Sequence, residues 1–305
     1  MSLREALEEY LTVRRVLGFI LAEPSRLLRK FVVYAEQEDT SFITTELAVR
    51  WAIQSDCQPA QWANRLSMVR RFACYMSALD ARTEIPPQDL LPHRFRRPQP
   101  YLYTDEEITH LIKAAQMLPS PLRLRGATYS TLYGLIAVTG MRVSEPVGLD
   151  RDDVDLNRGI LTVRRTKFGK TRMLPLHAST LEALRRYVDR RDRLFPRTRS
   201  FFVSERGTRL TVWSVEKTFV LLSRQIGLRS PEDSYGPRLH DLRHRFAVQT
   251  LLRWYRTDID VERHLPELST YLGHVHVADT YWYISAVPEL LHLATLRLEQ
   301  RGALR

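Results

Sequence analysis

The sequence predicts a mainly α-helical protein with one small β-sheet, divided into two domains. Three observations support this prediction. Apolar residues recur at helical steps in the first 80 residues, prolines cluster between 85 and 100, and residues 160–175 alternate with a period of two. A chain of 305 residues also exceeds the usual size of a single hydrophobic core.

Composition and charge narrow the functional classes. Hydrophobic residues make up 44% and charged residues 27%, which excludes a disordered or low-complexity chain. The 46 Lys and Arg exceed the 35 Asp and Glu, giving a net charge of +11 that favours a polyanionic partner such as nucleic acid. Cys57 and Cys74 alone cannot build a disulfide framework or a four-thiolate zinc site. Without a signal-like N-terminus or a long apolar run, we expect a cytoplasmic protein without a membrane segment.

Residues 1–92 are expected to form a helical domain. Two stripes at three- and four-residue steps are predicted to lie in its core: Leu3, Leu7, Tyr10, Val13 and Leu17, and Trp62, Leu66, Val69, Ala73 and Met76. The polar faces carry more arginine than a solvated surface requires. We therefore expect Arg65, Arg70 and Arg71 to contact nucleic acid, although a basic helix face is often only solvated.

Residues 93–100 are expected to be a basic linker. Prolines at this density cannot continue a helix, and Arg94, Arg96 and Arg97 would let the segment follow a phosphate backbone. A solvated spacer is the alternative interpretation.

Residues 101–305 are expected to form a second domain that mixes helices with a small sheet. The sequence from Thr104 to Glu107 has the pattern of a capping box, and 179–182 has the same pattern. Residues 160–175 read as a β-hairpin turning at Phe168 and Gly169, and 201–203 read as a short strand.

Four separated segments carry polar residues suited to phosphate chemistry. They are 139–145, with Arg142 and Glu145; 166–172, with lysines at the predicted hairpin tip; His240 to His244; and Leu272 to His274, followed by Tyr283. Each is weak or moderate evidence by itself, because charged hairpin tips and Arg–Glu pairs are common on protein surfaces.

In this order, the four segments resemble the catalytic domain of the tyrosine recombinases, the phage-integrase family, over residues 101–290. The resemblance implies a mixed α/β catalytic domain preceded by a helical core-binding domain that clamps DNA. It implies that the catalytic residues are Arg142, Lys167, His240, Arg243, His274 and Tyr283, with Glu145 in a supporting role.

The chemistry explains why such residues belong together. Two guanidinium groups, from Arg142 and Arg243, can bind the nonbridging oxygens of a phosphate under attack. Ionising a tyrosine such as Tyr283 at pH 7 costs roughly 4 kcal/mol, which nearby cations reduce. The resemblance implies that His240 accepts the hydroxyl proton or orients the hydroxyl, and that Lys167 protonates the leaving 5′ oxygen. His274 would donate to the phosphate.

The predicted reaction needs neither metal nor cofactor, because a 3′-phosphotyrosyl bond retains the energy of the broken bond. His274 and His276 lack the carboxylate or thiolate neighbours of a metal site. Tyr281 is the rival nucleophile, but it lies about 200° from Tyr283 around a helix, so only one can face the phosphate. Pro146 and Arg245 depart from the family pattern.

The predicted function is a site-specific DNA recombinase or integrase, with a mobile element as the preferred context. The expected partner is double-stranded DNA carrying specific recombination sites, contacted also by Lys170 and Arg172. We expect four copies to assemble on two paired sites in a nucleoid-associated complex, with the leucine-rich C-terminal helix as a candidate contact; burial of that helix within its own domain is the alternative. The alternatives are a type IB topoisomerase-like enzyme, a catalytically inactive DNA-binding accessory protein, or a metal-dependent nuclease.

Overall fold

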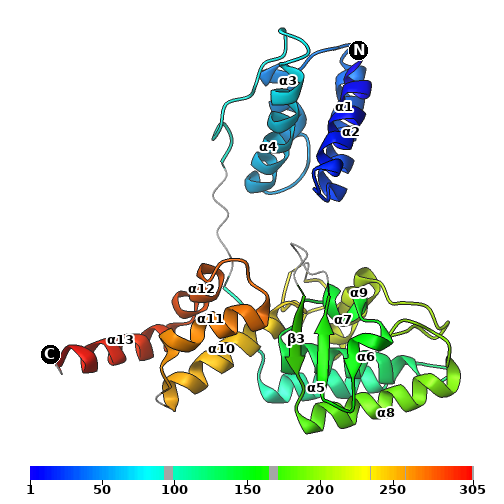
Figure 1. Ribbon diagram of the computed structural model, residues 1–305, viewed down its shortest axis with the longest axis vertical. Coiled ribbons are helices and arrows are strands. Elements are labelled where there is room, and N and C mark those ends of the chain that lie inside the picture. The colour runs from blue at the N-terminus through cyan, green and yellow to red at the C-terminus, as the bar shows by residue number, and fades with distance from the viewer. Residues whose placement is uncertain (93–98, 165–170, 234, 258, 304–305) are drawn as a thin grey trace. The chain divides into compact units, whose positions relative to one another are not determined.

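The computed structural model describes residues 1–92, 99–164, 171–233, 235–257 and 259–303. The chain forms two compact units, Met1–Pro98 and Gln99–Arg305 (Figure 1). The described residues are mostly helical, with a three-stranded antiparallel sheet, so the predicted fold class is confirmed. Among these residues, no helix combines the length and the apolar character needed to cross a bilayer.

The first unit is built from four helices. They are α1 (Leu3–Val16), α2 (Ala22–Gln37), α3 (Thr45–Ile53) and α4 (Pro59–Met76). The side chain of Ser2 accepts a hydrogen bond from the Glu5 amide while the Glu5 carboxylate accepts one from the Ser2 amide, a capping box that starts α1. The apolar faces of all four helices meet in one core.

Most of the residues predicted to lie in the core of the first unit are buried. In α1, Leu3, Leu7 and Tyr10 are buried, but Val13 is 46% and Leu17 66% exposed, so the prediction is wrong for these two. Spacing predicts the face on which a residue lies, whereas burial also needs a neighbouring helix beside it. Here α1 ends at Val16, and the chain turns away at Gly18, so the last turn keeps its apolar side chains in solvent.

The second unit holds the sheet and the remaining helices. The strands are β1 (Val154–Asp155), β2 (Ile160–Val163) and β3 (Arg172–Pro175), and a short 3-10 helix, Arg151–Asp153, precedes β1. The helices are α5 (Asp105–Gln116), α6 (Arg125–Thr139), α7 (Ser144–Gly148), α8 (Ala178–Leu194), α9 (Val212–Gln225), α10 (Asp241–Arg256), α11 (Val261–Leu272), α12 (Ala278–Ala286) and α13 (Pro288–Ala303).

The sheet has the order β1-β2-β3, and both pairings are antiparallel. Leu161 pairs with Leu174 and Val163 with Arg172, which confirms the two strands of the predicted hairpin; its predicted turn lies outside the described residues. The predicted strand at 201–203 is wrong. That segment makes only single-residue bridges, from Ser200 and Val203, while its aromatic side chains fill the core.

One of the two predicted capping boxes is confirmed. Thr104 and Glu107 exchange side-chain and backbone hydrogen bonds at the start of α5. The box predicted at 179–182 is wrong, because α8 already begins at Ala178 and the His177 side chain accepts the hydrogen bond from the Ser179 amide.

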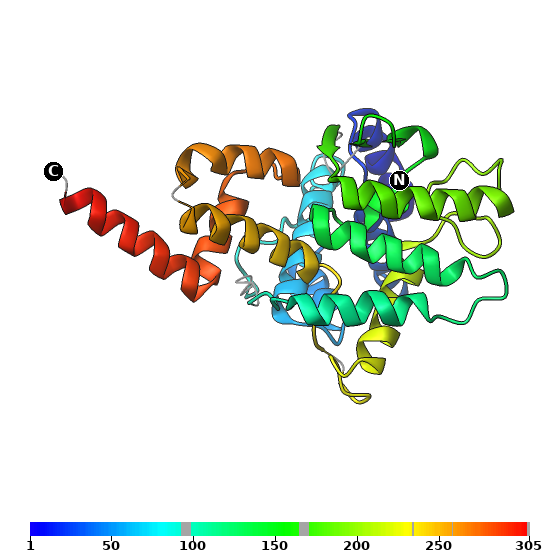
Figure 2. The same ribbon diagram turned by 90° about the horizontal axis from the view of Figure 1, so that it is seen from below.

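Two hydrophobic clusters lie within the second unit. One joins α5, α6, α8 and α9 to the sheet, and the other joins residues of α10, α11, α12 and α13. Figures 1 and 2 both show α10 to α13 gathered on one side of this unit and α5, α6 and α8 on the other. Because α10 packs against both α6 and α12, residues at its N-terminal end lie at the seam between the clusters.

The end of α6 should be sensitive to a single methyl group. Gly140 has φ 63°, and a Cβ there would lie 2.6 Å from Cδ1 of Phe246. We expect Gly140→Ala to lower the free energy of unfolding by about 1–3 kcal/mol through backbone strain and overpacking. Gly148→Ala, where a Cβ would meet nothing within 4 Å, is the control, and urea denaturation is the measurement. Equal stability of the two variants would contradict this expectation.

Candidate active site

Two helix ends in the second unit hold a pair of arginines. The helices α6 and α11 each end in a left-handed glycine, Gly140 and Gly273, and the last carbonyl groups of a helix lack intrahelical donors. Arg243 donates to the carbonyl oxygens of Gly140 and Leu272, both at 2.7 Å, and Arg142 donates to that of Gly273 at 2.9 Å. Residues from three distant segments therefore meet at one point.

The two guanidinium groups influence each other. Arg243 is buried, and burial, followed by the charge of Arg142, lowers the pKa of Arg243 to about 10. It remains a cation at neutral pH. Because the two positive charges repel each other, a bound anion would relieve this repulsion, which makes the pair a candidate phosphate site.

Glu145 supplies the fixed counter-charge for this pair. Its carboxylate accepts hydrogen bonds from the Arg142 amide at 2.8 Å and from the Arg142 side chain at 3.2 Å. Burial alone would raise the pKa of Glu145, but the hydrogen bonds and charge of Arg172, with the Arg142 amide, lower it. These contacts hold the Arg142 side chain in place, and the supporting role of Glu145 in catalysis stays a prediction.

The structure gives Arg172 a role that differs from the predicted DNA contact. Its guanidinium donates to both oxygens of Glu145, at 2.9 and 2.8 Å, and to the carbonyl of Tyr271 at 2.7 Å. Side chains alternate along β3, so Arg172 shares the inward face with Leu174 while Met173 is exposed. The predicted DNA contact of Arg172 is therefore corrected, because the alternation along β3 directs this side chain into the protein interior.

The predicted nucleophile is buried beside two histidines. Tyr283 on α12 is 2% exposed, and its hydroxyl lies 3.1 Å from Nδ1 of His244. The ring of His274 stacks on Tyr283 at a centroid distance of 6.4 Å, and Nδ1 of His274 lies 2.7 Å from Oγ1 of Thr280. Tyr281 is 50% exposed, so the two tyrosines point in different directions, as the helical spacing predicts.

His240 occupies the N-terminal end of α10, next to the arginines. Removal of water from its ring, followed by the charge of Arg243, lowers the pKa of His240 to about 4, although the residue as a whole remains exposed. The ring is therefore neutral at physiological pH. Its centroid lies 4.7 Å from that of His244.

Sequence reasoning missed His244 as a functional residue. The signal was present, because His240 and His244 are four positions apart and lie on the same face of a helix. It was overlooked because only the first histidine matches the family signature.

Apart from Arg172, the predicted DNA-contacting residues fall into three groups. Arg65 is held locally, since it donates to the carbonyl of Trp51 at 2.7 Å and lies over the indole ring at 4.0 Å; the structure thus gives it a packing role. Arg70 and Arg71 line a cavity of the first unit. The third group lies outside the described residues and consists of Arg94, Arg96, Arg97 and Lys170. The catalytic candidate Lys167 lies outside them too.

The two departures from the family pattern have local explanations. Pro146 is the third residue of the short helix α7, in its first turn, where its missing amide costs no hydrogen bond. Arg245 donates to the Tyr103 carbonyl and pairs with Asp105, which ties the segment before α5 to α10.

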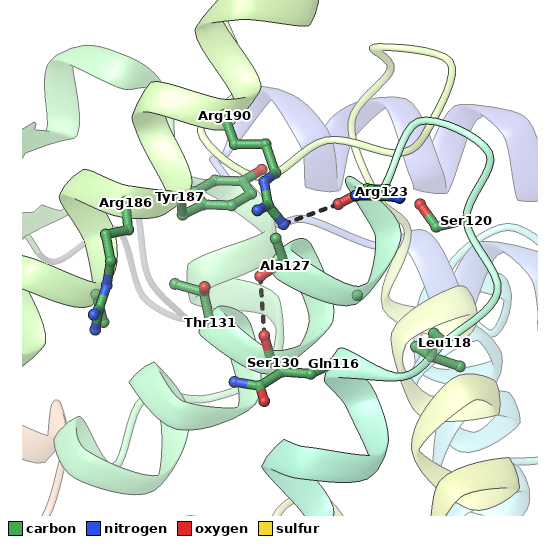
Figure 3. Close-up of a pocket in the computed structure, with 12 residues that line it drawn as sticks. Gln116, Leu118, Ser120, Arg123, Ala127, Ser130, Thr131, Arg186, Tyr187 and Arg190 are labelled. Carbon is green, nitrogen blue, oxygen red and sulfur yellow. Dashed lines mark hydrogen bonds between the residues drawn. The ribbon is translucent and has the colours of Figure 1, made fainter.

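Other cavities and clusters do not compete with this site. Among the described residues, no group of three or more His, Cys, Asp or Glu could hold a metal ion. A cavity of about 560 Å³ lies between α6 and α8 (Figure 3). There Arg190 donates to the carbonyl of Arg123, and none of the predicted catalytic residues lines the cavity.

Comparisons with known proteins agree with the geometry. The model of the phage integrase family matches residues 102–289. A Sinorhizobium fredii protein named as an integrase/recombinase, y4rB, is 50% identical over 307 residues, covering 98% of both chains. The tyrosine recombinase XerD of Neisseria meningitidis serogroup B is 32% identical over 241 residues, covering 76% of this chain and 77% of XerD.

Solved structures share the fold. The integrase of the Tn1549 transposon, in complex with circular intermediate DNA, superimposes with a TM-score of 0.69 at 16% identity, over 98% of this chain and 100% of that chain. The XerH recombinase bound to its palindromic difH substrate gives a TM-score of 0.65 at 20% identity, over 90% and 78% of the two chains.

Fold and sequence similarity together define a tyrosine-type site-specific DNA recombinase. The chain belongs to the phage integrase family.

The pair of Arg172 and Glu145 should contribute strongly to stability. Their side chains are 9% and 5% exposed, and removing one partner leaves a buried charge without its main neighbour. We expect Arg172→Ala to lower the free energy of unfolding by about 3 kcal/mol. Arg199→Ala is the matched control, since that side chain is 86% exposed, and its loss should cost less than about 1 kcal/mol. Similar urea midpoints for both variants would contradict the expectation.

Proposed function

We propose that Tyr283 attacks a DNA phosphate held by Arg142 and Arg243, forming a 3′-phosphotyrosyl bond. The observation that carries the proposal is the convergence of the two arginines on the ends of α6 and α11. In addition, the Tyr283 hydroxyl lies 3.1 Å from Nδ1 of His244, the residue that follows Arg243 in α10. A phosphate bound to both arginines would therefore lie within reach of the tyrosine.

The proposed reaction conserves the energy of the broken bond. The Tyr283 oxygen forms a bond to phosphorus, and the bond from phosphorus to the 5′ oxygen breaks. Lys167, which lies between β2 and β3 in the sequence, is proposed to protonate that oxygen. Rejoining reverses the step with a new 5′ hydroxyl, so no nucleotide cofactor or metal is required.

The arginines stabilise the charge that grows on the nonbridging oxygens in the transition state. His240, kept neutral by its surroundings, can hydrogen-bond the same phosphate without adding a third positive charge. His274, fixed by Thr280, is proposed to add a further donor.

We propose that both units bind duplex DNA at specific sites. The net charge of +11, the position of Arg70 and Arg71 in the first unit, and the basic segment 93–100 support this. Two proteins of similar fold are bound to DNA sites in their solved structures: XerH to its difH substrate and a lambda integrase dimer to a core site. Binding should weaken steeply with salt, because arginine contacts release counterions.

We propose a mobile element as the biological context and four copies on two paired sites as the active assembly. The similarity to an integrase/recombinase over nearly the full chain and to a transposon integrase in fold supports the first part. The enzyme would act on nucleoid DNA in the cytoplasm.

Covalent capture tests the proposed nucleophile. On a nicked suicide substrate, the wild-type protein should form a protein–DNA adduct, and Tyr283→Phe should form none, because it lacks the attacking oxygen. Tyr281→Phe is the matched control and should retain the adduct, with or without EDTA. An adduct in Tyr283→Phe that is lost in Tyr281→Phe would assign the nucleophile to Tyr281, and loss with EDTA would indicate metal chemistry.

The C-terminal helix offers a surface for contact between copies. Leu290 of α13 is fully buried against α10 and α12, whereas Leu291 and Leu298 are 52% and 66% exposed. We expect the double variant Leu291→Gln, Leu298→Gln to bind a single site normally but to lose synapsis of two sites, measured by gel shift. Unchanged synapsis would contradict a role for this face. Deleting the helix would be a weaker test, because Val287 and Leu290 pack in the same cluster as Tyr283 and their loss would disturb the site itself.

A further inference from the structure

Asp241, His244 and Tyr283 form a row of buried polar side chains. The Tyr283 hydroxyl lies 3.1 Å from Nδ1 of His244, and Nε2 of the same ring lies 3.8 Å from Oδ1 of Asp241. All three residues are at most 5% exposed. Asp241 and His244 are three positions apart on α10, so the helix itself holds the carboxylate behind the ring.

Asp241 is fixed in place by Arg238. The carboxylate accepts hydrogen bonds from the Arg238 amide at 2.8 Å and from its guanidinium at 2.8 and 3.3 Å. A fixed carboxylate on the Nε2 side favours the tautomer of His244 that carries its proton on Nε2. Nδ1 is then a lone pair directed at the Tyr283 hydroxyl, which is the arrangement a proton acceptor requires.

His240 is less suited to accept this proton. Its ring lies beside Arg243 and Arg142, both of which disfavour a positive charge on it. Asp241 favours a positive charge on both rings, but at His240 burial and the charges of Arg243, Arg238 and Arg142 outweigh it and lower the pKa.

We infer that His244 accepts the Tyr283 proton during cleavage and that Asp241 is a positioning residue that sets the tautomer of His244. This inference rests on the proposed function. As the Tyr283 oxygen bonds to phosphorus, its proton moves to Nδ1 of His244. The electron pair of the breaking bond goes to the 5′ oxygen, which takes a proton from Lys167. In the rejoining step, Tyr283 leaves and recovers its proton from His244.

The test combines His244→Gln with a fluorinated tyrosine at position 283. A fluorinated tyrosine ionises more readily, so its attack depends less on a base. We expect His244→Gln to slow adduct formation on the nicked substrate by about 10²–10⁴-fold. With 2,3,5-trifluorotyrosine at position 283, we expect the rate of adduct formation by His244→Gln to recover by at least about tenfold. If the rate did not recover, the inference would be overturned, because a more acidic hydroxyl does not repair a merely structural defect.

Matched variants separate the two histidines and the two proposals. Asp241→Asn should show a smaller loss, about tenfold, with the same partial recovery. His240→Gln should show a loss that the fluorinated tyrosine does not restore, and the opposite pattern would return the base role to His240. Tyr283→Phe tests the proposed function separately: if it abolishes an adduct that wild type forms, the nucleophile stands whatever the His244 result.

A measurement on the wild-type protein covers the case of misfolded variants. Nitrogen-15 NMR of the His244 ring in the DNA-free protein should show a neutral ring with Nδ1 unprotonated. A proton on Nδ1 in the neutral ring would overturn the inference.

Discussion

The site depends on carbonyl groups left free at the ends of two helices. Left-handed glycines end α6 and α11, and the carbonyl oxygens of Gly140, Leu272 and Gly273 accept the guanidinium hydrogens of Arg142 and Arg243. These partial negative charges let two cations approach each other without a bound anion. Glu145 also accepts a hydrogen bond from the Arg142 guanidinium and supplies a negative charge. Contacts within the protein thus organise the proposed phosphate site.

The position of the site follows from the packing of the second unit. Its arginines are held where the two hydrophobic clusters meet, and Tyr283 belongs to the cluster of α10 to α13. Because α10 and its N-cap residue contribute Arg243, Asp241 and both histidines, a single helix connects the proposed phosphate site to the proposed nucleophile. A shift of α10 relative to α12 would change the distance between tyrosine and phosphate, so the packing of these helices sets the reaction geometry.

Two histidines on one face of α10 lie in different environments. At His240, removal of water and the charges of Arg243, Arg238 and Arg142 outweigh Asp241 and keep the ring neutral, whereas Nε2 of His244 lies 3.8 Å from Oδ1 of Asp241. The proposed roles, one in hydrogen bonding and one in proton transfer, follow from this difference in burial and neighbouring charge.

The sequence by itself determined the helical fold class, the hairpin strands, the cap at Thr104 and the family, because these depend on local periodicity or on motif order. The tertiary structure decided what local patterns do not encode. The inward direction of Arg172, the pairing of Arg65 with Trp51 and the contact between His244 and Tyr283 each depend on a partner in another element of the fold. Likewise, Val13 and Leu17 have the spacing of core residues but remain exposed, because burial requires a neighbouring element and the helix ends first.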